Sequence, residues 1–357
     1  MGKDILQAVR ADIRELSAYP VADLSADWIK LDAMELPYRF PEEMAAELAD
    51  ELAAAPLNLY PNPATCGLQT ALRQAFGIPD EAQIALGNGS DELIQLLSML
   101  TAQKGSKMLA VEPSFVMYKH NAALYGMEYI GVPLNGDFSM NLPAVLAAVK
   151  ELRPALVFLA YPNNPTGVRF AREEIEAVLE AADGIVVVDE AYGSFSSDSF
   201  LNLAGSCENL VVMRTLSKIG FAGLRLGYAC GHPKLMNELA KITPPYNMNR
   251  LSLTAAEFAL KHREWIEEKT ALLKNERFRL SAAFAALPGV QPFPSEANFL
   301  TVRVADAEKV FSALKQANIL IKKLHGSHPL LEQCLRFTIG TPEQNDKVLA
   351  VVRSVSL

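Results

Sequence analysis

The chain has 357 residues, which is too long for one small core and predicts one large domain with a smaller one. Half of the residues are hydrophobic, 21% are charged, and the formal net charge at pH 7 is −8. This acidic balance argues against a surface for nucleic acids or anionic membranes. The four cysteines form no CxxC pair, which predicts reduced thiols and no metal site. Because the chain shows no signal peptide and no uncharged run that could span a bilayer, we expect it to be cytoplasmic.

Hydrophobic periodicity predicts that helices and strands alternate along the first two thirds of the chain. Segments rich in Ala, Glu and Leu, with apolar residues three and four apart, predict helices at 41–55 and 172–182. Short uninterrupted apolar runs predict strands covered on both faces. These runs lie at 155–161, 184–190, 210–215 and 225–230. Strands that alternate with helices indicate βαβ units and a mostly parallel sheet.

The pattern changes at about residue 250. A long charged helical pattern covers 253–287, and it is followed by a helix-like segment at 307–317 between apolar segments at 297–304 and 335–341. These features predict a smaller α+β domain, with the proline-containing segment 243–249 as the boundary. We therefore expect an N-terminal segment 1–40 that packs with the small domain, a large domain 41–248 and a small domain 249–357.

Polar residues follow several of the predicted strands, where ligands bind in α/β sheets. Asn164 lies in "NNPTG", and Asp189 ends a valine-rich strand in "DEAY". A carboxylate at that position is costly unless it is paired or hydrogen-bonded, although a capping role is the alternative. Lys218 follows the next strand in "TLSK", and Arg225 comes seven residues later. Read alone, Lys218 fits a structural role better than a functional one.

Two earlier segments add to this set. The segment "ALGNGSDELIQLLSML" predicts a strand, a glycine-rich turn and a helix with Ser90 as N-cap and Asp91 in its first turn. Such a helix start suits a phosphate, although a plain capped turn explains it equally well. In "PSFVMY", Phe115 follows a strand and could stack on a planar ring, with core packing as the alternative.

Together these residues fit one chemistry. A planar, phosphorylated pyridine aldehyde needs a lysine for a Schiff base, an acid for its ring nitrogen, donors for its ring oxygen and a cationic, hydroxyl-rich phosphate site. The residues that meet these needs, in that order, are Lys218; Asp189; Asn164 with Tyr192; and Ser90, Thr215, Ser217 and Arg225.

With these motifs the chain resembles the class I/II aminotransferases, which are pyridoxal-phosphate enzymes of fold type I. The matching motifs are "YPNP", "GNGSDE", "PSFVMY", "NNPTG", "DEAY", "TLSK…AGLR" and "LRFTIGT", which occur in the family's order over nearly the whole chain. Within this group it most resembles the histidinol-phosphate aminotransferases, on "SAYPVA", "LDAMELPY", "RTLSK" and "IKKLHGSHPLLEQCLRFTIGTPEQN".

The resemblance implies an α/β fold, in which a large domain with a mostly parallel sheet flanked by helices joins a smaller α+β domain. It implies pyridoxal 5′-phosphate as cofactor and a homodimer. It also implies that an amino group moves between L-histidinol phosphate with 2-oxoglutarate and imidazole-acetol phosphate with L-glutamate, in histidine biosynthesis. No nucleic-acid or membrane partner is implied.

The resemblance also assigns roles to single residues. Lys218 would bind the cofactor aldehyde and move the proton, Asp189 would hold the ring nitrogen protonated, and Tyr192 would act with them while sharing the ring oxygen with Asn164. Phe115 would stack on the ring. The phosphate would be bound by Ser90, Asp91, Thr215, Ser217 and Arg225, and by Tyr60 of the neighbouring subunit. The substrate would be bound by Tyr19, Asn298, Lys322 and Arg336.

The chain departs from its relatives at three points. Arg225 follows Lys218 by seven residues instead of the more frequent eight, so the loop between them must be tighter. Leu36 stands before a proline where close relatives commonly have asparagine. Lys322 stands where many histidinol-phosphate enzymes have a second substrate arginine, and it can neutralise a phosphate only as a point charge.

Three other functions stay open at this point. A phosphoamino-acid decarboxylase of the same fold would share every cofactor residue. An aromatic or branched-chain amino-acid aminotransferase would not require a phosphate on its substrate. A regulatory protein that binds the cofactor without turnover is disfavoured, because such proteins carry an added DNA-binding domain and only about 40 residues precede the first motif region here.

Overall fold

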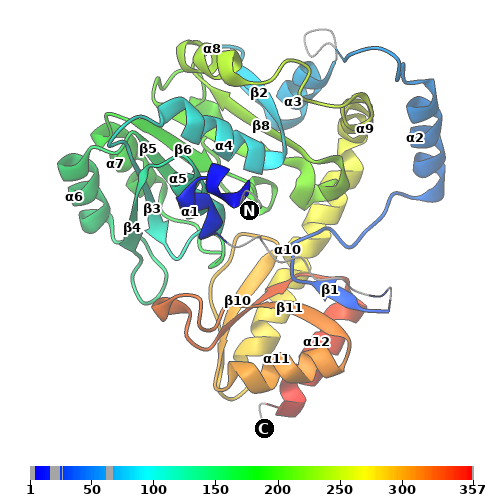
Figure 1. The fold of residues 1–357 in the computed structure, drawn as a ribbon. Helices are drawn as coiled ribbons and strands as arrows, with labels where there is room; N and C mark the ends of the chain where they lie inside the picture. Colours follow the sequence, from blue (N-terminus) through cyan, green and yellow to red (C-terminus); the bar gives the residue numbers. More distant parts are fainter. Residues whose placement is uncertain (1–4, 17–24, 26, 62–66, 356–357) are drawn as a thin grey trace.

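The computed structural model describes residues 5–16, 25, 27–61 and 67–355. Two β-sheets with their helices form the two parts of the molecule, and one long helix runs from the upper part to the lower one (Figure 1). No helix among the described residues is both long and apolar enough to cross a membrane.

The larger sheet has seven strands in the order β2-β8-β7-β6-β5-β3-β4. Its strands are β2 (Gln83–Asn88), β3 (Lys107–Glu112), β4 (Glu128–Pro133), β5 (Leu156–Ala160), β6 (Ile185–Asp189), β7 (Leu210–Thr215) and β8 (Leu226–Gly231). The five strands β3 to β7 pair in parallel, and β8 is antiparallel to both β7 and β2. The mostly parallel sheet and its four predicted strands are therefore confirmed.

Helices cover both faces of this sheet, which explains why its central strands read as uninterrupted apolar runs. The side chains of β7 alternate, with Leu210 and Val212 in one core cluster and Val211 and Met213 in the other. The helices around the sheet are α3 (Leu68–Phe76), α4 (Gly89–Thr101), α5 (Val116–Leu124), α6 (Leu142–Leu152), α7 (Arg172–Ala181) and α8 (Pro233–Ile242). Short 3-10 helices in the loops are η2 (Gly193–Phe195), η3 (Leu201–Leu203), η4 (Leu216–Ile219) and η5 (Ala222–Leu224).

The smaller sheet has the order β1-β11-β12-β10-β9, and only its β1–β11 pair is parallel. Its strands are β1 (Ile29–Leu31), β9 (Val290–Pro292), β10 (Phe299–Val304), β11 (Ile319–Lys323) and β12 (Cys334–Thr338). Helices α11 (Ala307–Gln316) and α12 (Pro342–Val355) pack here, and η6 (Pro329–Leu331) precedes β12. The N-terminal segment thus supplies an edge strand to this sheet.

The same N-terminal segment also reaches the large sheet's helices. It contains η1 (Ile5–Ala8) and α1 (Ala11–Arg14), and α1 lies against α5. The Arg10 guanidinium donates a hydrogen bond to the Leu124 carbonyl at 3.0 Å. The segment before residue 40 therefore contacts both parts of the molecule.

The helical pattern predicted over 253–287 is two helices, α9 (Arg250–Lys261) and α10 (Arg263–Ala285). They separate at His262, whose φ of −99° and ψ of 36° are not helical and whose ring packs on Phe258. Helix α9 packs against α2 (Glu42–Ala54) and α3, whereas α10 continues to the smaller sheet (Figure 1). The domain limits at 40 and 248 stay predictions.

Candidate active site

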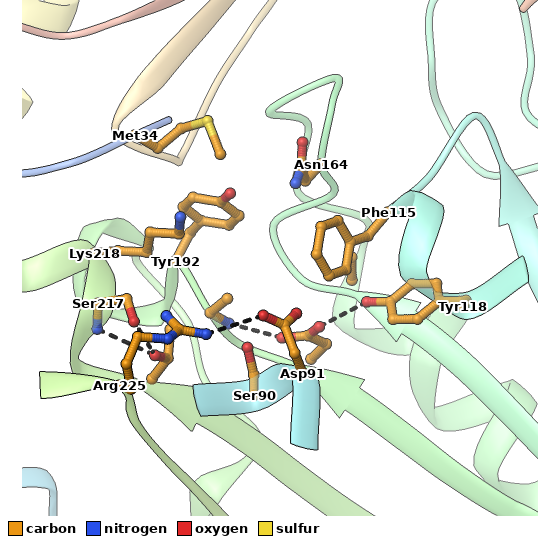
Figure 2. A pocket seen from close by; sticks show the side chains of 14 residues that line it. Met34, Ser90, Asp91, Phe115, Tyr118, Asn164, Tyr192, Ser217, Lys218 and Arg225 are labelled. Atoms are coloured by element: carbon orange, nitrogen blue, oxygen red, sulfur yellow. Dashed lines mark hydrogen bonds and ion pairs between the residues drawn. The ribbon is translucent and has the colours of Figure 1, made fainter. Parts of the chain in front are cut away.

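Ten of the fifteen residues predicted for the site line one cavity between the two sheets (Figure 2). They are Ser90, Asp91, Phe115, Asn164, Asp189, Tyr192, Thr215, Ser217, Lys218 and Arg225. The cavity lies at the carboxyl ends of β5, β6 and β7, whose last residues Ala160, Asp189 and Thr215 all line it. The parallel strands bring these ends to one edge of the sheet, which is why residues far apart in sequence meet there.

Asp189 is a buried carboxylate at the bottom of this cavity. Its Oδ2 accepts a hydrogen bond from the Tyr118 hydroxyl at 2.7 Å, and its Oδ1 accepts from the Ala191 backbone N–H at 3.0 Å. Burial raises the pKa of Asp189 to about 6, against the effect of these two bonds. No ion pair joins Asp189 to another side chain within the described part of the chain. A cation supplied by a ligand would therefore be strongly favoured at this carboxylate.

Lys218 lies on η4, directly after β7, and points toward the cavity from the side opposite Asn164 (Figure 2). Its Nζ donates to the Ala33 carbonyl oxygen at 3.1 Å and lies 5.9 Å from the centre of the Tyr192 ring. Burial, together with the positive charge of Arg336, lowers the pKa of Lys218 to about 8. This environment makes the neutral amine, which is the nucleophilic and basic form, far more accessible than in an exposed lysine.

Backbone, hydroxyl and guanidinium groups converge at the start of α4. Thr215 Oγ1 accepts from the Ser217 backbone N–H at 3.1 Å and lies 2.9 Å from its hydroxyl. Arg225 donates to Asp91 Oδ2 at 3.2 Å. A Cβ placed on Gly89 would lie 2.7 Å from Arg225 Nη2, so only glycine lets the guanidinium lie over this helix start. Such a combination suits a phosphate.

The expectation that Ser90 caps α4 is wrong. The helix begins at Gly89 after Asn88, and Ser90 lies inside its first turn. The Glu92 carboxylate accepts the Asn88 backbone N–H at 2.7 Å. Ser90 lines the cavity.

The segment from Lys218 to Arg225 contains two residues with left-handed backbone. Gly220 has φ +112°, and Arg225 itself has φ +50°. Leu36 lies against this loop, because a Cβ on Gly220 would be 3.0 Å from Leu36 Cδ2. The contact between Leu36 and the loop is therefore apolar.

Three of the four residues predicted to bind substrate, Asn298, Lys322 and Arg336, belong to the small-sheet part of the molecule. Arg336 is buried on β12, where it donates to Asn164 Oδ1 at 2.6 Å and to the Asp32 carbonyl at 2.8 Å. Lys322 is its direct partner in the β11–β12 register, so the two cations face the same side of the sheet. Asn298 Nδ2 donates to the Met34 carbonyl at 2.9 Å.

Five predicted residues do not line the cavity. Arg336, Lys322 and Asn298 are not among its lining residues, although Arg336 contacts the lining residue Asn164 directly. Tyr60 is 79% exposed and stacks on Tyr246 with ring centres 4.8 Å apart, away from this chain's own cavity. Tyr19 lies outside the described residues.

Sequence reasoning missed Tyr118 and Met34, which also line the cavity. Tyr118 lies three residues after Phe115, and this spacing places two residues on one side of a helix turn, so a signal was present. Met34 belongs to a segment that crosses the cavity mouth, where its backbone N–H donates to Thr338 Oγ1 at 3.1 Å. No local pattern marks it, because the contacts that place it come from about 300 residues away in sequence.

Comparison with known proteins agrees with this geometry. The family model "Aminotransferase class I and II" matches residues 26–352. A histidinol-phosphate aminotransferase of Neisseria meningitidis serogroup C is 61% identical over 99% of this chain and 98% of its own length, and one of Chromobacterium violaceum is 56% identical over 98% of both.

Solved structures carry the same fold. The histidinol-phosphate aminotransferase of Sinorhizobium meliloti in complex with pyridoxal-5′-phosphate aligns with a TM-score of 0.86 and 25% identity, over 97% of this chain and 96% of that one. The fold is also that of an L-threonine-O-3-phosphate decarboxylase from Porphyromonas gingivalis, with a TM-score of 0.77 and 24% identity over 91% of this chain and 98% of that one. The fold alone therefore does not distinguish an aminotransferase from a decarboxylase. Sequence identity above 50% over nearly the full length does distinguish them. The chain belongs to the class I and II aminotransferases, within the group of histidinol-phosphate aminotransferases.

Proposed function

We propose that the protein uses pyridoxal 5′-phosphate to transfer an amino group between L-histidinol phosphate and 2-oxoglutarate, with imidazole-acetol phosphate and L-glutamate as products. The observation that carries this proposal is the pairing of Lys218, with its lowered pKa, and the buried Asp189 at neighbouring strand ends of one cavity. The relatives at 56–61% identity support the choice of substrate. A biosynthetic role places the enzyme in the cytoplasm.

The residues of the cavity fit this cofactor. Asp189 lacks a cation partner in the described structure, and a protonated pyridine nitrogen would supply one. The close approach of Arg225 to Gly89 leaves a guanidinium over the start of α4 for the phosphate. Phe115 projects into the cavity beside Asp91, where its face can cover a planar ring (Figure 2). When bound, the cofactor supplies the aldehyde that takes up the amino group and a ring that accepts an electron pair.

Lys218 is proposed to move the proton. Its Nζ takes the proton from the α-carbon of the amino donor and later returns it, as general base and then general acid. With a pKa of about 8, about a tenth of the amine is neutral at pH 7, compared with about three in ten thousand at the ordinary value of 10.5. The hydrogen bond to the Ala33 carbonyl holds Nζ at the cavity when it is not bonded elsewhere.

The substrate end must accept a carboxylate in one half-reaction and a phosphate in the other. Arg336 and Lys322 lie opposite each other on β12 and β11 and supply two positive charges to the same face. Two like charges on directly opposite residues repel each other, and an anion between them would relieve this repulsion. Arg336 already touches Asn164, so a substrate bound there would lie beside the predicted cofactor ring.

The protein is proposed to act as a homodimer. Helix α2 has no buried residue in the single chain and lies at its outer edge (Figure 1). Exposed apolar side chains extend from it toward the start of α9: Leu57, Leu59, Tyr60, Tyr246 and Leu251, which are 41–79% exposed. Exposed apolar side chains in such number support an interface, and Tyr60, which stacks on Tyr246, would reach the partner's phosphate site from it.

A panel of half-reactions tests the proposed function. The cofactor-loaded protein is mixed separately with L-histidinol phosphate, phenylalanine, aspartate and threonine phosphate, while the absorbance of the bound cofactor and any released carbon dioxide are recorded. We expect L-histidinol phosphate to convert the cofactor to its amine form at a far lower concentration than the others, without carbon dioxide. Preference for phenylalanine, release of carbon dioxide from threonine phosphate, or full turnover by Lys218→Ala would each overturn the proposal.

A further inference from the structure

A second cavity of about 500 Å³ lies between α10, η2 and the loop from residue 293 to 300, and shares no lining residue with the active site. One face of α10 forms its floor. Lys274, Arg277, Phe278 and Ser281 all line it and are spaced three, one and three residues apart, so that they follow one side of the helix.

Two cations in this cavity lack an acidic partner. Arg277 is only 5% exposed, and its one hydrogen bond in the described structure joins Nη1 to the Ala297 carbonyl at 2.6 Å. The other N–H groups of its guanidinium have no acceptor among the described residues. Lys274 is half-buried and has neither a hydrogen bond nor an ion pair within the described part of the chain.

The nearest carboxylate, Glu296, raises the pKa of both cations by its charge, but within the described part of the chain it makes no hydrogen bond or ion pair with either. Glu296 accepts from Arg169 Nε at 2.9 Å, from the Ser196 hydroxyl at 3.0 Å, and from the N–H and hydroxyl of Ser197 at 2.7 and 2.8 Å. Burial lowers the pKa of both Lys274 and Arg277, and Arg277 lowers that of Lys274 further by repulsion. An anion held between the two side chains would therefore be stabilised by both charges and would relieve their repulsion.

An apolar surface adjoins the two cations. The Phe278 ring is 68% exposed at the edge of the cavity, and Phe195 lies on the opposite wall with Leu300. Isolated exposed aromatic rings are ordinary, but a ring next to one buried and one half-buried cation without an ion-pair partner among the described residues provides both parts of a site for an amphipathic molecule.

We propose that this cavity binds a small organic anion, whose carboxylate or phosphate is held by Lys274 and Arg277 and whose apolar part lies against Phe278. The bound molecule would contact α10 and also Ser196 and Ser197, which follow η2 on the large-sheet side. It would therefore join the two parts of the molecule through a cavity that shares no lining residue with the active site. This inference stands independently of the substrate proposed above.

Calorimetric titration of the cofactor-loaded protein tests the site, with phenyl phosphate and benzoate as separate probes so that the two anionic groups are distinguished. We expect at least one probe to bind the unchanged protein at a site that Lys274→Ala weakens about tenfold or more, the magnitude of one lost charge-assisted hydrogen bond. The Lys274→Ala variant should keep the cofactor absorbance and the transaminase rate. Lys347→Ala, which removes an exposed lysine of α12, should bind the probe like the unchanged protein.

The Arg277→Gln variant should weaken the same binding event, provided that it folds. Lys274→Ala decides the question if it does not, because Lys274 makes no bond that the fold depends on. The proposal is overturned if neither probe binds, or if Lys274→Ala binds both probes with the stoichiometry and affinity of the unchanged protein. Equal weakening by Lys347→Ala would also overturn it, since the effect would then be one of net charge.

Discussion

Glu296 joins the two parts of the molecule, and its replacement by glutamine should loosen that contact. It lies in the loop between β9 and β10, and its carboxylate binds Arg169, Ser196 and Ser197 on the large-sheet side. Two residues later in the same loop, Asn298 donates to the Met34 carbonyl above the active-site cavity. Glutamine keeps the shape of the side chain but turns an NH₂ group toward donors, so that the charge-assisted bonds are lost.

The size of the effect follows from the pKa of Glu296. The hydrogen bonds to Ser197, Arg169 and Ser196 outweigh burial and lower this pKa from 4.5 to about 2. The full shift corresponds to about 3 kcal/mol, and partial access of solvent to the side chain reduces this to about 1–2 kcal/mol. Because the folded-state pKa is depressed, the stabilisation is complete above pH 4.5 and is lost only as the pH falls toward 2. At neutral pH it is therefore fully present.

Hydrogen–deuterium exchange at pH 7 measures this contact locally, which matters because a chain of this size need not unfold in one step. The Ser197 amide donates directly to Glu296, so in Glu296→Gln it should exchange about 5 to 30 times faster. Glu308→Gln is the matched control, because it removes an exposed carboxylate of α11 whose partner is Lys323 at 2.7 Å. The reasoning is refuted if the Ser197 amide exchanges in Glu296→Gln as slowly as in the unchanged protein. It is also refuted if Glu308→Gln accelerates this exchange as much as Glu296→Gln does.

Two further replacements test the active-site cavity. The hydrogen bond from the Tyr118 hydroxyl lowers the pKa of Asp189, so Tyr118→Phe should raise this pKa further above about 6. The pH below which the cofactor no longer binds should then be higher, which an absorbance titration of the bound cofactor measures. An acid limit that stays in place would show that this hydroxyl does not control the carboxylate. Met34 has φ +55°, where glycine has no steric cost, so Met34→Gly should melt at a higher temperature than Met34→Ala. The opposite and more usual order would mean that the backbone relaxes in the variants.

Periodicity identified the elements of the large sheet because burial on both faces leaves a simple signal. The apolar run 210–215 coincides with β7, and the run 184–190 extends only one residue beyond each end of β6. Periodicity did not predict the break between α9 and α10 at the single residue His262, because the helical pattern continues on both sides of it. His262 packs on Phe258 four residues earlier, and its Nε2 lies 3.6 Å from a carboxylate oxygen of Glu47 in α2, a contact that the local pattern does not reveal.

The residues of the candidate site also fall into those that the sequence predicts and those that it does not. Residues at strand ends, such as Asp189 and Lys218, could be predicted because the parallel sheet fixes where its strands end. The contacts that set their pKa values are harder to predict, because the hydrogen bond from Tyr118 to Asp189 spans 71 residues and Arg336, whose charge lowers the pKa of Lys218, lies on β12. A sequence motif therefore identifies the candidate group, while the pKa of that group depends on contacts that only the fold creates.

The loop between Lys218 and Arg225 depends on a contact with Leu36. Gly220 has φ +112° and Arg225 has φ +50°, and Gly220 leaves a backbone surface with no side chain. Leu36 and Trp265 cover that surface, and the Ser252 hydroxyl holds the loop by donating to the Leu224 carbonyl at 2.7 Å. An asparagine at position 36 would place an amide against this apolar surface without a partner, so the leucine belongs with the shorter loop. With the seven-residue spacing, the guanidinium of Arg225 reaches Gly89 at the start of α4, as the proposed phosphate site requires.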